Sequence, residues 1–176
     1  MAKLRKTLGS VQSETAVAYM RLIETQSKET LARWAVEYVK TEYMPIIKKH
    51  KGQDERLHHA CDMVEQYLRK EIKLTELKPA LADARKAAQE LEENPTVQAA
   101  ARAVATACAV ITTSTNALGF TLYGMAAYAY DTVGLQEDVA TYDMFAAKEQ
   151  ERILCSLRSV AVEKESNPVK VDWNCK

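Results

Sequence analysis

The chain has 176 residues, of which 47% are apolar and 27% charged, as in ordinary globular domains. Only five glycines and four prolines interrupt it, so we expect few turns and long helices. The 24 basic and 24 acidic side chains cancel, which excludes the global positive field typical of proteins that bind nucleic acid or anionic membranes.

The first two helices are expected on either side of Ser27. Apolar residues on one face predict a first helix over residues 12–26. Ser27 or Thr30 can cap a second helix, whose apolar residues follow the i, i+3, i+4 spacing. Pro45 should interrupt or kink the end of that helix.

Two further helices are expected after Gly52. The third, over residues 54–70, begins with acidic side chains, where the helix dipole favours negative charge. The fourth, over residues 75–91, carries an apolar stripe at helical spacing and tolerates Pro79 because that proline lies near its first turn.

The fifth predicted helix leads into a long stretch without charged residues. Asn94 and Pro95 are an N-cap and a first-turn proline. Residues 103–130 then carry no charge, and the polar run 112–116 divides them into two helices or one broken helix. Because that run would place polar groups near the centre of a bilayer, we interpret the stretch as a buried helix pair and expect no membrane partner.

Gly134 should end this unit and precede a last helix over residues 137–163. Its apolar stripe consists of Val139, Tyr142, Ala146, Ile153, Leu157 and Val160. No segment shows a convincing strand pattern. The sequence therefore predicts an all-α, single-domain helical bundle over residues 1–176, with six to seven helices around the central alanine-rich, charge-free pair and with a loose arm (1–9) and tail (166–176).

The polar run 112–116 interrupts an element that should be buried. We expect an internal helix cap in which Ser114, Thr115 or Asn116 accepts hydrogen bonds from free backbone amides. A small polar pocket between helices is the alternative.

The densest titratable cluster lies in the third predicted helix. His58, Asp62 and Glu65 are spaced i, i+4 and i+7, so they share one helix face and could offer a nitrogen and two oxygens to a metal ion. Metal sites in bundles usually draw ligands from facing helices. We therefore interpret this face as solvated and expect no metal or other cofactor, with a metal-binding protein or metal-dependent enzyme as the alternative.

Other chemical signals in the chain are few. No motif of nucleophilic catalysis, zinc proteases or phosphate-binding loops occurs. Cys61, Cys108 and Cys155 fall on apolar helix faces and should be inert buried thiols, whereas Cys175 should be exposed in the tail. Their wide spacing, and the lack of an apolar run after the basic N-terminus, favour a cytoplasmic protein.

Charged residues outside that cluster are expected to be solvated. Two short basic groups, within residues 3–6 and 48–51, lack interleaved aromatic residues, so we expect no nucleic-acid partner. Arg102, the one charge in an apolar pattern, should reach the surface or pair with an acidic residue, the candidates being Asp54, Glu55 and Glu71.

Several short motifs resemble a known family. They are, in chain order, Ala32-Arg33-Trp34-Ala35, Tyr43-Met44-Pro45, Asp54-Glu55-Arg56, Glu71-Ile72, the alanine-rich residues 99–107, Asn116-Ala117-Leu118-Gly119 and Tyr123. Over about residues 28–160 this order resembles the bacterial and archaeal immunity proteins of the Imm-5-like type. The resemblance implies a non-enzymatic protein that binds and neutralises a cognate protein toxin.

The resemblance also singles out positions without assigning them roles. These positions are Asp54, Arg56, Arg102, Asn116 and Tyr123. The family pattern has Asp-Asp-Arg-Pro where this chain has Asp54, Glu55, Arg56 and Leu57. It also has histidines in the alanine-rich region that this chain lacks, one of them where Asn116 stands. If that histidine is structural, Asn116 can replace it as a hydrogen-bonding residue; if it is functional, this chain has lost or altered the function.

A structural homo-oligomer is the third hypothesis. In it, an amphipathic helix, the last one above all, would bury its apolar stripe against a second copy of the chain.

Overall fold

The computed structural model describes residues 4–173, which form eight α-helices and one short 3-10 helix. The elements are α1 (Glu14–Ile23), α2 (Lys28–Glu42), α3 (Met44–Lys49), α4 (Glu55–Leu68), α5 (Leu74–Glu90), α6 (Pro95–Cys108), η1 (Ala109–Ile111), α7 (Asn116–Val133) and α8 (Val139–Val160). Within residues 4–173 no β-strand occurs beyond an isolated bridge between Ser27 and Pro168. The prediction of an all-α bundle is confirmed.

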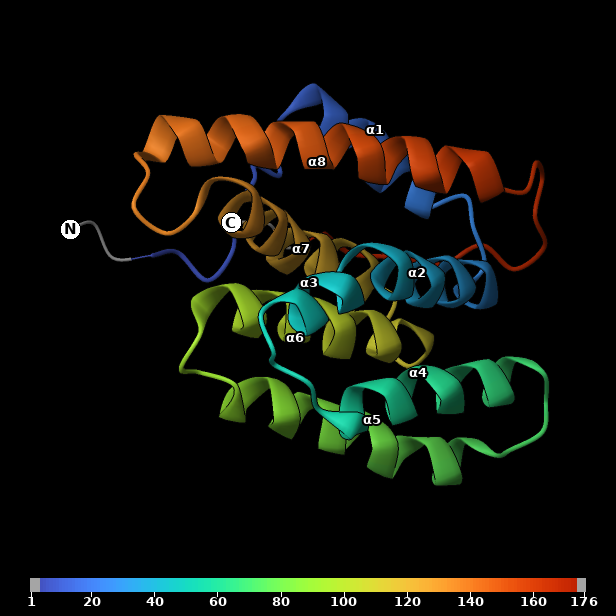
Figure 1. The fold of residues 1–176 in the computed structure, drawn as a ribbon. Helices are drawn as coiled ribbons and strands as arrows, with labels where there is room; N and C mark the ends of the chain where they lie inside the picture. The colour runs from blue at the N-terminus through green and yellow to red at the C-terminus, as the bar shows by residue number, and fades with distance from the viewer. Residues whose placement is uncertain (1–3, 174–176) are drawn as a thin grey trace.

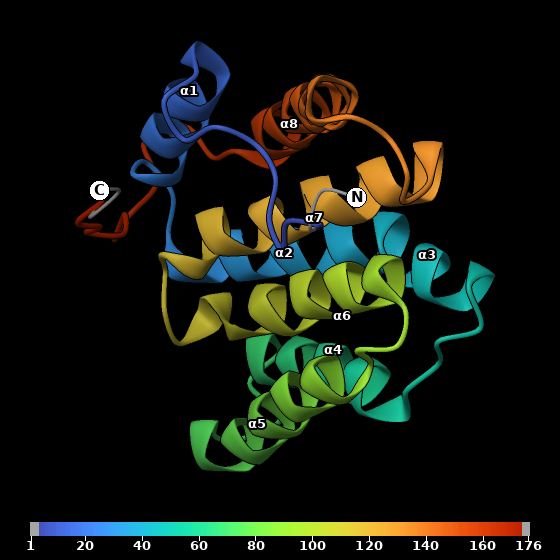
Figure 2. The same ribbon diagram turned by 90° about the vertical axis from the view of Figure 1, so that its left-hand side faces the viewer.

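The helices are stacked in layers (Figure 1). The α4–α5 hairpin forms one outer layer and α8 with α1 forms the other, while α2, α3, α6 and α7 lie between them; Figure 2 shows the same order from the side. Helices α6 and α7 contain most of the charge-free stretch 103–130 and pack more extensively against each other than any other pair. The stretch is therefore the centre of the core, as expected from its composition.

Several helix boundaries follow from capping residues predicted from the sequence. Ser27 accepts a hydrogen bond from the amide of Thr30, and the side chain of Asn94 accepts from the amides at the start of α6. Pro45 ends the preceding helix as expected, but it also begins α3, a six-residue helix that the sequence analysis did not separate from α2.

The polar run 112–116 has a different role from the one predicted. The side chains of Thr112 and Asn116 donate hydrogen bonds to the carbonyl of Ala109, at 3.0 and 3.3 Å, and so satisfy the end of α6. No side chain caps the start of α7, because backbone carbonyls of the turn accept the amides of its first residues. The prediction that Ser114, Thr115 or Asn116 would accept from free amides is therefore wrong.

This break also interrupts the longest apolar part of the chain. Among residues 4–173, every helix is too short or too polar to cross a lipid bilayer.

The N-terminal arm is attached to the bundle. Leu8 is 2% exposed, and its amide donates to the carbonyl of Leu122 at 3.1 Å. The hydroxyl of Tyr130 donates to the carbonyl of Arg5 at 2.6 Å. The prediction of a loose arm is wrong for residues 4–9, because the arm buries an apolar side chain and satisfies its backbone against α7.

The C-terminal tail is attached as well. Its residue Val169 donates its amide to the carbonyl of Gln26 at 2.8 Å, and the indole of Trp173 donates to Glu24 at 2.7 Å. Three apolar tail residues pack against the core, so the prediction of a loose tail is wrong for residues 166–173. Cys175 lies outside the described residues.

One close contact in the core requires a glycine. A Cβ atom added to Gly124 of α7 would lie 2.2 Å from Cζ of Tyr43. The Tyr43 ring is 0% exposed and its hydroxyl is hydrogen-bonded to Glu149, so the ring cannot move aside without losing that bond. Gly119, in the same helix, has room: its nearest neighbour would be a methyl group of Thr106 at 3.5 Å.

We therefore predict opposite effects for alanine at these two glycines. Gly124→Ala should lower the free energy of unfolding by about 1–3 kcal/mol through overpacking against Tyr43. Gly119→Ala should raise it by about 0.5–1 kcal/mol, because alanine is the better residue inside a helix. Urea unfolding monitored by circular dichroism measures both, and equal effects would contradict the predicted contact.

Candidate functional site

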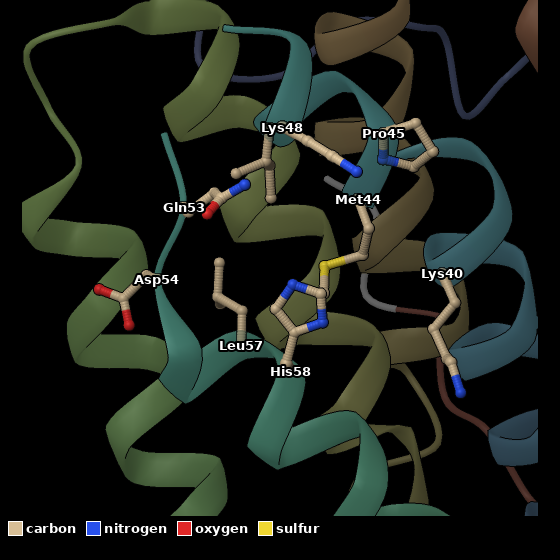
Figure 3. A pocket seen from close by; sticks show the side chains of 9 residues that line it. Lys40, Met44, Pro45, Lys48, Gln53, Asp54, Leu57 and His58 are labelled. Carbon is tan, nitrogen blue, oxygen red and sulfur yellow. The ribbon is translucent and has the colours of Figure 1, made fainter. Parts of the chain in front are cut away.

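A groove runs along the surface between α2 and α4. Its first part is a cavity of about 330 Å³ between α3, the end of α2 and the first turn of α4 (Figure 3). Its second part is a cavity of about 470 Å³ farther along the two helices. Lys40 lines both cavities, so we refer to them together as the α2–α4 groove and to the smaller one as the first pocket.

The first pocket has an apolar floor and a polar rim. Ile47 and Leu57 are buried beneath it, and Met44 is half-buried at its side. The rim carries Lys40, Lys48, Gln53, Asp54 and His58. An apolar floor with a few polar groups is typical of a binding pocket.

The connection between α3 and α4 shapes this pocket. Lys51 adopts a left-handed conformation (φ 57°), which turns the chain sharply after α3. At Gly52 a Cβ atom would lie 2.3 Å from a methyl group of Val97, so the absence of a side chain lets the connection lie directly on α6. Asp54 then caps α4 by accepting the amide of Arg56 at 3.0 Å.

Arg56 joins the start of α4 to the end of α5. Its guanidinium donates two hydrogen bonds to Asp54, at 2.9 and 2.7 Å, and one to Glu90 at 2.6 Å. The hydrogen bonds from Arg56 hold the pKa of Asp54 below its ordinary value. Asp54 is therefore a paired, ionised carboxylate at the edge of the first pocket.

The three metal candidates are not brought together with further ligands. His58 lines the first pocket, Glu65 lines the second part of the groove, and Asp62 is exposed. Glu65 accepts from Nζ of Lys40 at 2.6 Å, and this hydrogen bond raises the lysine pKa. No three or more His, Cys, Asp or Glu side chains within residues 4–173 form a group that could hold a metal ion.

The remaining positions singled out by the resemblance lie apart from the groove. Arg102 is partly exposed on α6 and forms no ion pair with residues 4–173, so it reaches the surface, as one of the two expectations had it. Tyr123 is half-buried against the core. Asn116, with Arg85 and Thr106, lines a separate pocket of about 90 Å³, to which the other residues of the run 112–116 do not contribute.

Sequence analysis missed a buried carboxylate, Glu149 of α8. It is 0% exposed, and its Oε1 accepts from the hydroxyls of Tyr38 at 2.8 Å and Tyr43 at 2.7 Å. Its Oε2 accepts from Arg152 at 2.6 Å, and Arg152 also contacts Glu42. Glu149 lines no part of the α2–α4 groove, so its role is to hold α8 against the corner between α2 and α3.

A signal for this carboxylate was present in the sequence. Glu149 lies between Ala146 and Ile153 at i, i+3 and i+7, which places it on the apolar stripe of the last helix. A charged residue on such a stripe must be paired when it is buried, and tyrosine hydroxyls on a facing helix can supply the pairing.

The cysteine predictions are confirmed for two of the three described thiols. Cys61 of α4 and Cys108 of α6 are buried, with their sulfur atoms 3.6 Å apart. The hydrogen bond with Cys61 and burial raise the pKa of the Cys108 thiol, which makes it a poor nucleophile. The prediction for Cys155 is wrong: it is exposed, because its neighbours Ile153 and Leu154 occupy the inward face of α8.

The apolar stripe of α8 is used within the chain itself. Tyr142, Ala146, Ile153 and Leu157 are buried, and only Val139 and Val160 at its two ends are exposed. The central stripe is therefore not a surface that a second copy of the chain could cover.

Comparison with known families identifies most of the chain. The family model described as Imm-5 like putative immunity protein matches residues 21–155. No curated protein and no solved structure matches the chain. The matched residues include all of α2 to α7, and therefore every residue that lines the α2–α4 groove.

Replacing Glu149 by glutamine should change how stability depends on pH. Burial raises the pKa of Glu149, so the folded protein binds this proton more tightly than the unfolded chain does. The wild type should therefore lose stability relative to Glu149→Gln as the pH rises from the ordinary glutamate range through the raised pKa. The slope of that difference should be at most about 1.4 kcal/mol per pH unit.

Urea unfolding of wild type and Glu149→Gln across this pH window measures the difference in their free energies of unfolding. The contributions of the other titrating groups cancel in this difference. Glu151→Gln is the matched control, because Glu151 lies on the same helix but is exposed. A difference between wild type and Glu149→Gln that does not vary with pH would contradict the prediction.

Proposed function

Because this chain belongs to the family of Imm-5 like immunity proteins, we propose that it binds a cognate protein toxin through the α2–α4 groove and neutralises it without catalysing a reaction. The observation that carries the proposal is where the motifs of the resemblance lie. Arg33 lines the second part of the groove, and Met44, Pro45 and Asp54 line the first pocket. Three separate motifs on α2, on α3 and at the start of α4 thus contribute to one surface.

The groove has the properties that a protein partner needs. Energetically important contacts in interfaces usually come from side chains that fill a pocket surrounded by polar residues that exclude water. The first pocket offers buried apolar side chains with charged residues around them. Most of its lining residues belong to α2, α3 and α4, and Asp54 is fixed as the N-cap of α4, so little conformational entropy is lost on binding.

The charges around the groove support binding over catalysis. Lys40 is paired with Glu65, and Asp54 is held by Arg56. A general acid or base needs a proton that it can exchange with a substrate near its operating pH. The pairing lowers the pKa of Asp54 and raises that of Lys40, which moves both groups away from that range. These side chains can instead contribute electrostatic complementarity to a partner.

The proposal is tested by co-expressing this chain with a toxin candidate chosen from its neighbouring genes. Wild type should restore growth, and His58→Trp should abolish most of the protection, because the indole would fill the first pocket from its rim. The matched control is His59→Trp: His59 is equally exposed on α4 but does not line the groove, so protection should be retained.

Both variants should fold, since each replaces an exposed side chain, and thermal unfolding checks this. Binding measured by calorimetry should weaken at least about tenfold for His58→Trp, the loss expected when an interface residue worth more than about 1.4 kcal/mol is blocked. Failure of the wild type to bind or neutralise the toxin would refute the proposed function. Equal protection by the two variants would refute the groove as the binding surface.

A further inference from the structure

Among the charged side chains that line the first pocket, Lys48 alone forms no ion pair within the described residues 4–173. Lys40 is paired with Glu65, at 2.6 Å, and Asp54 with Arg56, at 2.7 Å. Lys48 is exposed and forms no ion pair with any residue in the range 4–173. Its ammonium group is therefore available to a ligand.

The acidic side chains near Lys48 are already paired with other basic residues. Lys49 and His50 both contact the same oxygen of Asp131, at 2.8 Å each, on the side of α3 that faces α7. Asp54 adds little repulsion for an incoming anion, because the guanidinium of Arg56 is bound to it. In Figure 3 the Asp54 carboxylate lies well away from the amine of Lys48, which points toward Pro45.

The space beneath Lys48 suits one apolar group. The floor consists of Ile47 and Leu57, with Met44 beside them. A volume of about 330 Å³ is at the lower end of cavities that hold small ligands. It is therefore suited to a single large side chain and not to an extended cofactor.

We propose that the first pocket is the anchor site for an apolar side chain of a protein partner, and that a carboxylate next to this side chain contacts Nζ of Lys48. The proposal rests on the proposed function and specifies the chemistry of the partner. A segment with an acidic residue beside its apolar anchor would satisfy Lys48. A basic residue in the same place would be repelled by Lys48.

The chemistry can be tested without the toxin. N-acetyl-L-phenylalanine combines an aromatic ring with a carboxylate, and N-acetyl-L-phenylalaninamide is its neutral counterpart. Titration of the full chain with each probe, followed by methyl NMR, should shift the resonances of Met44, Ile47 and Leu57. The acid should bind about two- to fivefold more tightly than the amide, the range expected for one exposed ion pair.

Two variants test whether Lys48 causes the preference for the acid. Lys48→Gln should remove the preference for the acid and leave the affinity for the amide unchanged. Lys78→Gln should keep the preference, because Lys78 is an exposed lysine of α5 that does not line the groove. The proposal is overturned if millimolar probe leaves the three sets of methyl resonances unshifted, or if the preference for the acid persists in Lys48→Gln.

Co-expression distinguishes this proposal from the proposed function. If the wild type neutralises its toxin, Lys48→Glu should reduce binding at least about tenfold, because a favourable contact becomes a repulsive one. Full protection by Lys48→Glu would overturn the proposal for Lys48 while leaving the proposed function intact. A wild type that does not neutralise the toxin would instead refute the proposed function, and the probe titrations would still decide whether the pocket binds an apolar group with a carboxylate.

Discussion

The position of α8 relative to α2 and α3 depends on the hydrogen bonds of one buried carboxylate, that of Glu149. It connects α8 to Tyr38 near the end of α2 and to Tyr43 between α2 and α3. Removing an ionised group from water costs several kcal/mol. Here two hydroxyls and a guanidinium offset that cost, so the carboxylate is stable only when α8 and the α2–α3 corner are in one relative position. A hydrophobic contact would tolerate sliding between helices, whereas these directional bonds do not.

The same interaction reaches the α2–α4 groove. Tyr43 immediately precedes Met44 and Pro45, which line the first pocket. Because the Tyr43 ring is held between Glu149 and the backbone of Gly124, the start of α3 has a defined position. The other side of the pocket is set separately, by Gly52 lying on α6 and by Asp54 capping α4. Two independent constraints therefore hold the walls of the pocket, which explains how short exposed segments can form a preformed site.

Helix periodicity and capping chemistry predicted most of the fold, because both act within a few residues of the chain. Local sequence was enough to predict the N-caps at Ser27 and Asn94 and the central position of the charge-free stretch. The groove could not be predicted in this way, since it depends on contacts such as that of Lys40 with Glu65, whose partners lie on different helices. The metal hypothesis rested on residue spacing along one helix, and this spacing contains no information about the pairing of Glu65 with Lys40 of another helix. The exposure of Cys155 and the attachment of the terminal arm and tail likewise depend on how the elements pack.

The motifs of the resemblance divide into two groups with different physical roles. Arg33, Met44, Pro45 and Asp54 line the groove, whereas the alanine-rich segment, Asn116 and Tyr123 belong to the centre of the bundle and its edge. The departure at Asn116 falls in the second group. Its side chain donates to the carbonyl of Ala109, a bond that the ring N–H of a histidine can also make. Asn116 therefore contributes a hydrogen bond that ends α6, and it lies outside the surface through which we propose that the protein binds.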